Sequence, residues 1–246
     1  MEIRGLNTRY LRPAAYLATA ILVLLWPLRP GATAQNPQLQ ERLAEVKQAS
    51  DLNKLALLQY SWQEQQTISI KGKVRKQNLF LVKLGPNGKP QKRPIEAGDD
   101  SSSDGGRQHG IKHRIKEKKK EEYEDYAQQI AELAQGYAQP DSAKLQQLYQ
   151  QGFVMIGSAG APDEVRLVIQ NYVKQGDSVT IVFNRAQKAI QNIQVSSYLS
   201  APSDVVKIAV QFAQLSDGTN HVSNVLVNGV SKELNVEMQN SNYQKQ

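Results

Sequence analysis

The chain has 246 residues and contains no cysteine, which excludes disulfides, thiolate metal sites and a cysteine nucleophile. Its formal net charge is +7, but four arginines and one glutamate lie in the first 34 residues, so only +4 remains for residues 35–246. A nucleic-acid-binding domain spreads lysine and arginine over one face, whereas most of the positive charge here sits in one short cluster. We therefore expect no nucleic-acid partner.

The first 34 residues have the three parts of a secretory signal peptide. Arginines precede an apolar run over 14–28, and the small-x-small motif of residues 32–34 follows as a cleavage site. The run of about 15 residues is shorter than the roughly 20 that span a bilayer. We therefore expect cleavage after Ala34 and export of residues 35–246 to the periplasm as a single soluble domain.

A helix is expected directly after this leader, because leucines recur there mostly at helical spacing. From Tyr60 the period changes to two, so that Trp62, Glu64 and Gln66, and so on to Val74, share one face of a long, half-buried strand. The polar side chains on this face indicate either an opening to water at one end or hydrogen bonds inside a lined cavity.

The next segment predicts an edge of the sheet and then helices. A second strand is expected over 79–84, and the extended return after it carries two prolines, which confine it to an edge. Residues 96–110 have almost no apolar side chains, so burial cannot offset the entropy of ordering them, and a mobile loop is expected. A helical insertion is predicted over 111–151, with its long first helix ending near Gly136 to Pro140.

Seven further strands are predicted after Gly152, near 153–156, 165–173, 179–183, 190–199, 205–215, 222–230 and 233–243. Short turns join them, whereas parallel pairing would need connections of about a dozen residues. The predicted fold class is therefore α+β: a large curved antiparallel sheet, an unclosed barrel, with helices covering its concave side.

The long helix of the insertion has an apolar stripe and a basic start. We expect the stripe to cover the sheet as a lid helix, through Tyr123, Tyr126, Ile130, Leu133 and Tyr137. The basic residues before it are Lys112, Arg114, Lys116, Lys118, Lys119 and Lys120. The helix macrodipole disfavours such charges by about 0.3–1 kcal/mol each. They form either a solvated face or a contact with an anionic surface such as lipid headgroups.

Catalytic and metal-binding motifs are not found. His109 and His113 have helical spacing, but a catalytic metal site needs three protein ligands, a structural one needs four, and only His221 remains to help. No G-x-S-x-G elbow and no phosphate-binding loop is present. We therefore predict a protein that is not an enzyme and that uses no metal and no cofactor.

Four features in this order carry a resemblance to a known family: the signal peptide, the leading amphipathic helix, the first strand YSWQEQQTISIKGKV, and a helical insertion before a long meander. Over residues 37–246 the chain resembles the lipoprotein-sorting superfamily of LolA-like and LppX-like exported proteins. The resemblance implies an unclosed barrel whose concave face is covered by helices and holds an acyl chain or lipid.

The function that this resemblance implies is non-catalytic binding of a lipid, an acyl chain or a lipidated polypeptide in the periplasm. The alternative is an envelope sensing or protein-interaction module with the same fold, docking through the charged helix. The apolar residues expected to line a ligand site would equally serve a plain core; they are Trp62, Ile68, Ile70, Leu79, Leu81, Val179, Ile181, Phe183, Ile208, Val210 and Phe212.

Overall fold

The structure is a computed structural model of the chain, and it describes residues 48, 51–86, 88–95, 111–138 and 142–246. Within the helices, the side chains of 111–117, 120, 138, 142, 143 and 146 are outside this description. The predicted leader, most of the predicted first helix and the predicted mobile loop over 96–110 also lie outside it. Among the described residues, no helix combines the length and the apolar character needed to cross a membrane.

Ten strands and two helices make up most of the described chain, together with a short helix over 51–57 and a 3-10 turn, η1 (Val230–Lys232). The helices are α3 (Ile111–Ala138) and α4 (Ser142–Gln150). The strands are β1 (Tyr60–Ile70), β2 (Lys73–Leu84), β3 (Pro90–Pro94), β4 (Val154–Ser158), β5 (Glu164–Gln170), β6 (Ser178–Asn184), β7 (Ala189–Tyr198), β8 (Val205–Gln214), β9 (Asn220–Gly229) and β10 (Leu234–Lys245).

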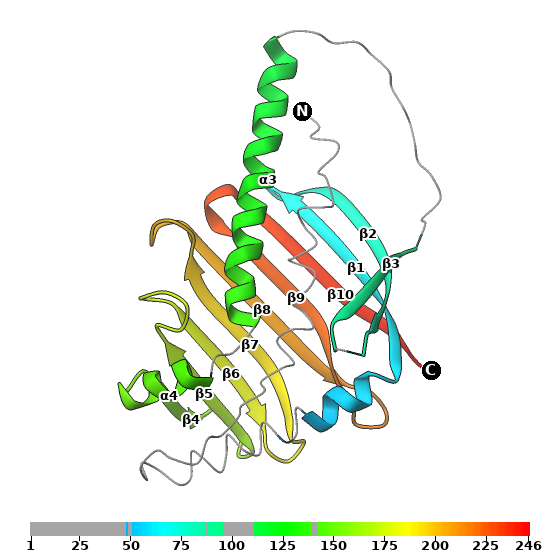
Figure 1. Cartoon of the computed structure of the whole chain (residues 1–246), viewed down its shortest axis with the longest axis vertical. Helices are drawn as coiled ribbons and strands as arrows, with labels where there is room; N and C mark the ends of the chain where they lie inside the picture. Colours follow the sequence, from blue (N-terminus) through cyan, green and yellow to red (C-terminus); the bar gives the residue numbers. More distant parts are fainter. Residues whose placement is uncertain (1–47, 49–50, 87, 96–110, 139–141) are drawn as a thin grey trace.

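All ten strands form one antiparallel sheet in the order β3-β2-β1-β10-β9-β8-β7-β6-β5-β4. The short strands β3 and β4 are its two edges, so the sheet does not close on itself (Figure 1). Every neighbouring pair except β1 and β10 is consecutive in the chain, as short turns dictate. The predicted fold class, an unclosed antiparallel α+β sheet with covering helices, is confirmed.

The first hairpin differs from the prediction. The predicted strand ran on to Val74, but β1 ends at Ile70, and Lys71 and Gly72 form a two-residue turn with φ values of 52° and 69°. Two positive φ values suit the twist of a tight hairpin. The second strand therefore begins at Lys73, earlier than predicted. The sequence did not indicate this turn, because a lysine rarely adopts a positive φ value.

One face of the sheet, called here the inner face, packs against α3. A side chain at Gly229 would lie 2.6 Å from Tyr126 Cε1 and 2.6 Å from Ile130 Cδ1, so the helix approaches the β9 backbone closely. Three alanines of α3, at 127, 131 and 134, are buried in the same interface, and their small side chains permit this approach. The amino-terminal half of α3 rises beyond the sheet (Figure 1).

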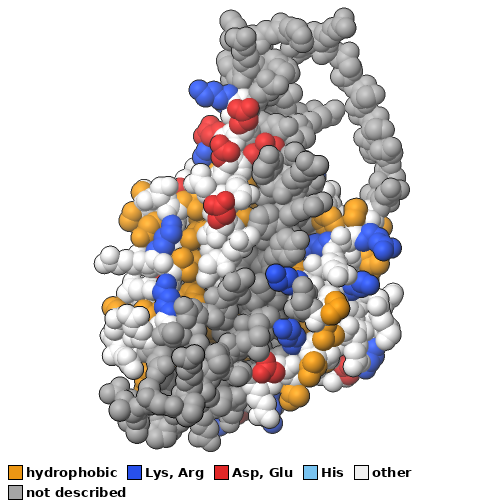
Figure 2. Space-filling model, viewed as in Figure 1, with side chains coloured by type: hydrophobic (Ala, Val, Ile, Leu, Met, Phe, Trp, Pro, Cys, Tyr) orange, Lys and Arg blue, Asp and Glu red, His pale blue; other side chains and the backbone are white. Residues whose placement is uncertain are grey.

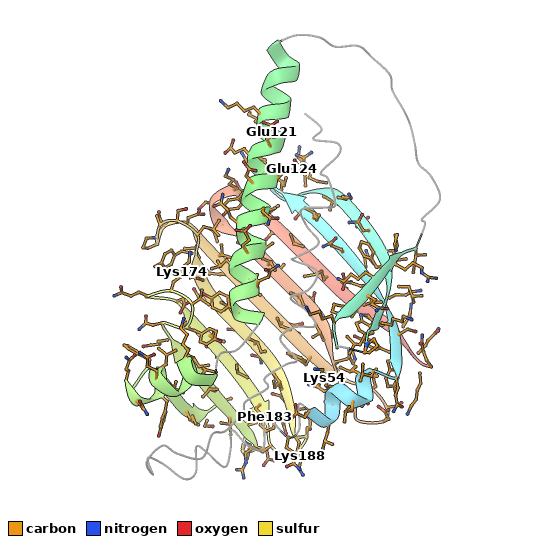
Figure 3. The ribbon with its side chains drawn as sticks, in the orientation of Figure 1. Lys54, Glu121, Glu124, Lys174, Phe183 and Lys188 are labelled. Atoms are coloured by element: carbon orange, nitrogen blue, oxygen red, sulfur yellow. The ribbon has the colours of Figure 1, made fainter. Side chains whose placement is uncertain are left out.

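The short helix over 51–57 is fixed to the opposite end of the sheet. Asn53 and Asn220 exchange two hydrogen bonds: the Asn53 amide donates to the Asn220 carbonyl at 2.7 Å, and the Asn220 N–H donates to Asn53 Oδ1 at 2.6 Å. Lys54 of this helix, labelled in Figure 3, lies against the β2–β3 hairpin, where a side chain at Gly88 would be 2.4 Å from its Cε. These contacts hold the helix beside the start of β1.

Candidate functional site

The structure brings most of the predicted apolar site residues together on the inner face. Trp62, Ile68, Ile70, Val179, Ile181, Phe183, Ile208 and Val210 are buried there in one hydrophobic cluster, and Phe212 is half-buried against it. Burial of each such aliphatic side chain contributes about 1.5–3 kcal/mol to folding. These residues form the core in the described state, and a ligand-binding role for them stays a prediction.

Leu79 and Leu81 do not belong to this group. In the β1–β2 register Leu79 pairs with Gln65 and Leu81 with Gln63, so both leucines point to the outer face, and Leu81 is 41% exposed. Their placement beside Trp62 was wrong because the register shifts between Ile68 and Ser69. The turn pairs Ser69 with Val74, but beyond the shift Ile68 pairs with Lys76, and this extra residue moves both leucines to the outer face.

The predicted lid helix covers the inner face with its apolar stripe. Tyr126, Ile130, Leu133 and Tyr137 are buried, and Tyr123 is half-buried. The Tyr126 hydroxyl donates to Asp204 at 3.0 Å, and burial together with this carboxylate raises the pKa of Tyr126 to about 12. The tyrosine therefore remains a hydrogen-bond donor throughout the physiological pH range.

The basic start of α3 is only partly described. Lys118 and Lys119 are exposed, whereas the side chains of Lys112, Arg114, Lys116 and Lys120 lie outside the description. Figure 2 shows acidic side chains gathered on α3 where it leaves the sheet. On the same helix, Glu122 pairs with Lys232 at 2.6 Å, and this pairing lowers the pKa of Glu122.

A polar cluster interrupts the apolar inner face beside the β3 edge. Glu64 and Gln66 follow Trp62 on this face of β1, and their exposed fractions are only 2% and 3%. Lys92 of β3 reaches over β2 to form an ion pair with Glu64, and its ammonium also lies 5.9 Å from the centre of the Phe80 ring. The predicted polar residues of β1 are thus buried rather than open to water.

Strands β9 and β10 complete the cluster. Asn240 lies opposite Glu64 in the β1–β10 register, and Tyr243 stacks on Trp62 with ring centroids 5.3 Å apart. The carbonyl of Val222 accepts hydrogen bonds from Asn240 Nδ2 at 3.0 Å and from the Tyr243 hydroxyl at 3.1 Å. The His221 ring packs 4.2 Å from that of Tyr243. The polar cluster is defined as Trp62, Glu64, Gln66, Lys92, His221, Asn240 and Tyr243.

Three polar atoms of this cluster have no hydrogen-bond partner among the described residues. They are Trp62 Nε1, Gln66 Nε2 and Asn240 Oδ1, and they account for three of the five such buried atoms in the described chain. A buried polar group without a partner costs about 1–3 kcal/mol. Such atoms are rare in native proteins, so three on one small surface indicate that something else satisfies them.

Burial sets the charge of the cluster. It raises the pKa of Glu64 and lowers that of Lys92, and the ion pair opposes both changes. Both pKa changes favour the neutral form of the side chain. The pair carries no net charge in either state, whether the proton is on Lys92 or on Glu64. Burial also lowers the pKa of His221, which favours its neutral imidazole.

The cluster presents hydrogen-bonding groups rather than a net charge. It offers two N–H donors and one acceptor next to a large apolar surface. Among the described residues, no group of three or more His, Asp or Glu side chains is arranged to hold a metal ion.

Sequence reasoning identified part of this cluster. The period-two alternation placed Glu64 and Gln66 on the face of Trp62, but it did not point to Lys92, Asn240 or Tyr243. Those residues meet β1 only through strand pairing, and no local pattern states which strand lies next to β1. The Pro90 and Pro94 pair, which predicted an edge strand, was the one available signal for the element that carries Lys92.

No protein-family model matches the chain, and no curated protein matches it. A DUF1329 family protein from Desulfovibrio piger is similar in structure, with 11% identity and a TM-score of 0.37 over 82% of this chain and 92% of that chain. A LolA superfamily protein from Nitrosomonas europaea has 9% identity and a TM-score of 0.38 over 82% and 93%. The superfamily that the sequence resembles is thus represented among the similar structures, at TM-scores too low to carry an argument about function.

Proposed function

We propose that the protein is an exported, non-catalytic binding protein that holds an acyl chain, a lipid or a lipidated polypeptide on the inner face of its sheet in the periplasm. The leader pattern of the first 34 residues supports export. An extended apolar surface covered by a helix supports binding of a hydrocarbon chain.

The observation that carries the proposal is the polar cluster at one side of this apolar face. Its three unpartnered atoms need hydrogen-bonding groups, and the neighbouring side chains of Ile68, Ile70, Val236 and Met238, buried in the described state, would contact an apolar chain once the elements that cover them moved. An amphiphile supplies both at once, since its chain is apolar and its headgroup is polar. Water alone would satisfy the polar atoms, but it would not replace the apolar contacts that these side chains lose when the covering elements move.

The contacts of α3 suit a helix that yields to a ligand. Besides its apolar stripe, the helix is tied to the sheet by a few polar contacts, which include Tyr126 with Asp204, Tyr137 with Asp177 and Glu122 with Lys232. Entry of a chain requires the elements over the inner face to move, and these contacts are replaceable by water.

Native mass spectrometry of the protein released from the periplasm tests this function. We expect a mass excess of several hundred daltons over the processed chain, removed by extraction with organic solvent and identified as lipid in the extract. A chain that appears only at its own mass, in several independent preparations and without solvent treatment, would contradict the proposal.

A second function is favoured by the free end of α3. The amino-terminal half of this helix projects beyond the sheet, and Lys118 and Lys119 are exposed on it. Such a helix suits docking to an anionic membrane or to an envelope protein, since each lysine near an anionic surface contributes about 1 kcal/mol. The chain would then act as a sensing or interaction module.

Charge reversal separates the two functions. The double variant Lys118→Glu and Lys119→Glu is expected to lose cosedimentation with anionic vesicles, or a crosslinked partner, while its lipid content is unchanged. Lys207→Glu, an exposed position on β8 far from α3 in sequence, is the matched control. Equal sedimentation of all three proteins would remove this second function.

A further inference from the structure

The polar cluster has a length that restricts what it can bind. Trp62 and Gln66 lie four residues apart on the same face of β1, a span of about 13 Å in an extended strand. Asn240 lies between them, opposite Glu64 on β10. This span separates the backbone positions of the two donors, and a ligand with several polar groups along its length matches such an arrangement.

The charge of the cluster restricts the ligand as well. Lys92 is the only basic residue of the cluster that is not a histidine, and Glu64 pairs with it. A phosphate or carboxylate placed here would therefore meet a neutralised ammonium and the buried Glu64 carboxylate. The unpartnered atoms are two amide-like or indole N–H donors and one carbonyl acceptor, which match uncharged esters and amides.

We infer that the polar cluster binds the uncharged linkage region of an acylated ligand, with two or more ester or amide groups. Carbonyl oxygens of this region accept hydrogen bonds from Trp62 Nε1 and Gln66 Nε2, and an N–H or O–H donates to Asn240 Oδ1. The acyl chains then extend over the neighbouring apolar part of the inner face. The inference rests on the proposed function and names its ligand class: neutral diacyl esters or acyl amides, in preference to fatty-acid anions and anionic phospholipids.

Trp62 provides a direct measurement. Of the two tryptophans, Trp26 lies in the expected leader, so the processed protein carries Trp62 as its sole indole. Bromine atoms on an acyl chain quench indole fluorescence at contact distance. Three probes with the same 9,10-dibromostearoyl chain, delivered in the same dilute detergent, separate the ligand classes: the free fatty acid, the 1,2-diacylglycerol and the phosphatidylglycerol.

We expect the brominated diacylglycerol to reach half-maximal quenching at the lowest concentration. Gln66→Leu is expected to raise that concentration about fivefold, the equivalent of one hydrogen bond of about 1 kcal/mol. Gln65→Leu is the matched control, because Gln65 is the neighbouring glutamine on the outer face and is exposed. Gln66→Met, which keeps the length of the side chain, replaces Gln66→Leu if that variant lacks the circular dichroism of the parent.

The possible outcomes test the preference for a neutral linkage separately from the proposed lipid-binding function. Quenching that is strongest with the fatty acid or the phosphatidylglycerol overturns the preference for a neutral linkage, and leaves lipid binding intact. Equal quenching curves for the Gln66 and Gln65 variants overturn the role of the cluster, again without touching lipid binding. Absence of quenching by all three probes overturns the proposed function and the inference together.

Discussion

The Tyr137 hydroxyl donates to the Asp177 carboxylate at 2.5 Å, and this bond ties the carboxyl end of α3 to the turn before β6. The same carboxylate accepts the backbone N–H groups of Tyr172, Val173 and Lys174 at 2.6–2.8 Å. The Asp177 carboxylate therefore stabilises the turn and also anchors the carboxyl end of α3. Burial raises the pKa of Tyr137, which keeps the hydroxyl protonated as a donor.

Tyr137→Phe should lower the free energy of unfolding by about 1.5–3 kcal/mol, because it removes one hydrogen bond to a buried charged group and leaves Ser197 without this contact. Urea unfolding measures the change. Tyr198→Phe is the control, since its hydroxyl donates to the Gln175 carbonyl at an exposed site, and we expect a loss of no more than about 0.5 kcal/mol. Equal losses in the two variants would contradict the role of Tyr137.

Gly229→Ala should destabilise the contact between α3 and β9. The added methyl group would lie 2.6 Å from atoms of Tyr126 and Ile130, both buried, so the helix must shift at a cost of about 1–3 kcal/mol. Gly157→Ala is the control, since a methyl group there meets nothing within 4 Å. That variant should match or slightly exceed the parent in thermal stability. A Gly229→Ala protein as stable as the parent would show that α3 packs less closely.

The ion pair between Glu64 and Lys92 is suited to a double-mutant cycle. Glu64→Leu alone should cost about 3 kcal/mol, because it leaves the Lys92 ammonium largely buried, with a side chain only 13% exposed. Lys92→Met alone should cost a similar amount. The double variant should lose clearly less than the sum of the two single losses, as measured by urea unfolding. Additive losses would mean that the two side chains act independently.

Tyr60→Phe should change the titration of Asp217. The Tyr60 hydroxyl donates to Asp217 at 2.6 Å, and this bond is the main cause that lowers the pKa of Asp217 from 3.8 to about 2. The variant should return this pKa toward 3.8 in a carbon-detected NMR titration. Because the folded-state pKa is depressed, the associated stability is present above about pH 4 and is lost as the pH falls toward 2.

The stability gap between the parent and Tyr60→Phe should therefore narrow as the pH falls from 4 to 2. Tyr198→Phe serves again as the control, because its hydroxyl donates to a carbonyl oxygen, which does not titrate. An Asp217 pKa that does not move in Tyr60→Phe would assign the depression to Thr219, whose N–H donates to Asp217 at 3.0 Å.

The period-two pattern predicted which residues of β1 share a face, because successive side chains of any strand point to opposite sides. It held for Trp62, Glu64 and Ile68, all of which are buried on the inner face. It could not carry over to β2, because the pairing of β1 with β2 shifts by one residue between Ile68 and Ser69. Without this shift Leu81 would lie opposite Trp62, and no local pattern marks the extra residue.

The polar cluster required knowledge of pairing across long stretches of chain. Glu64 meets Lys92 across 28 residues, and Asn240 reaches the same place from the last strand. The sequence around Asn240 alternates like any half-buried strand, and its position beside β1 depends on which of several similar strands takes the central place. Local periodicity contains no such information, whereas the strand order of the folded sheet supplies it.

The pairing of β1 with β10 also governs when this sheet can form. Residue 60 pairs with residue 245, so the two halves of the sheet join only through β10, which follows the other nine strands in the sequence. Hairpins on either side can form early, because their contacts are local, but the pairing between the two halves requires β10 and carries a large loop-closure cost. A chain threaded through a narrow channel, amino terminus first, thus cannot complete this sheet until β10 has passed.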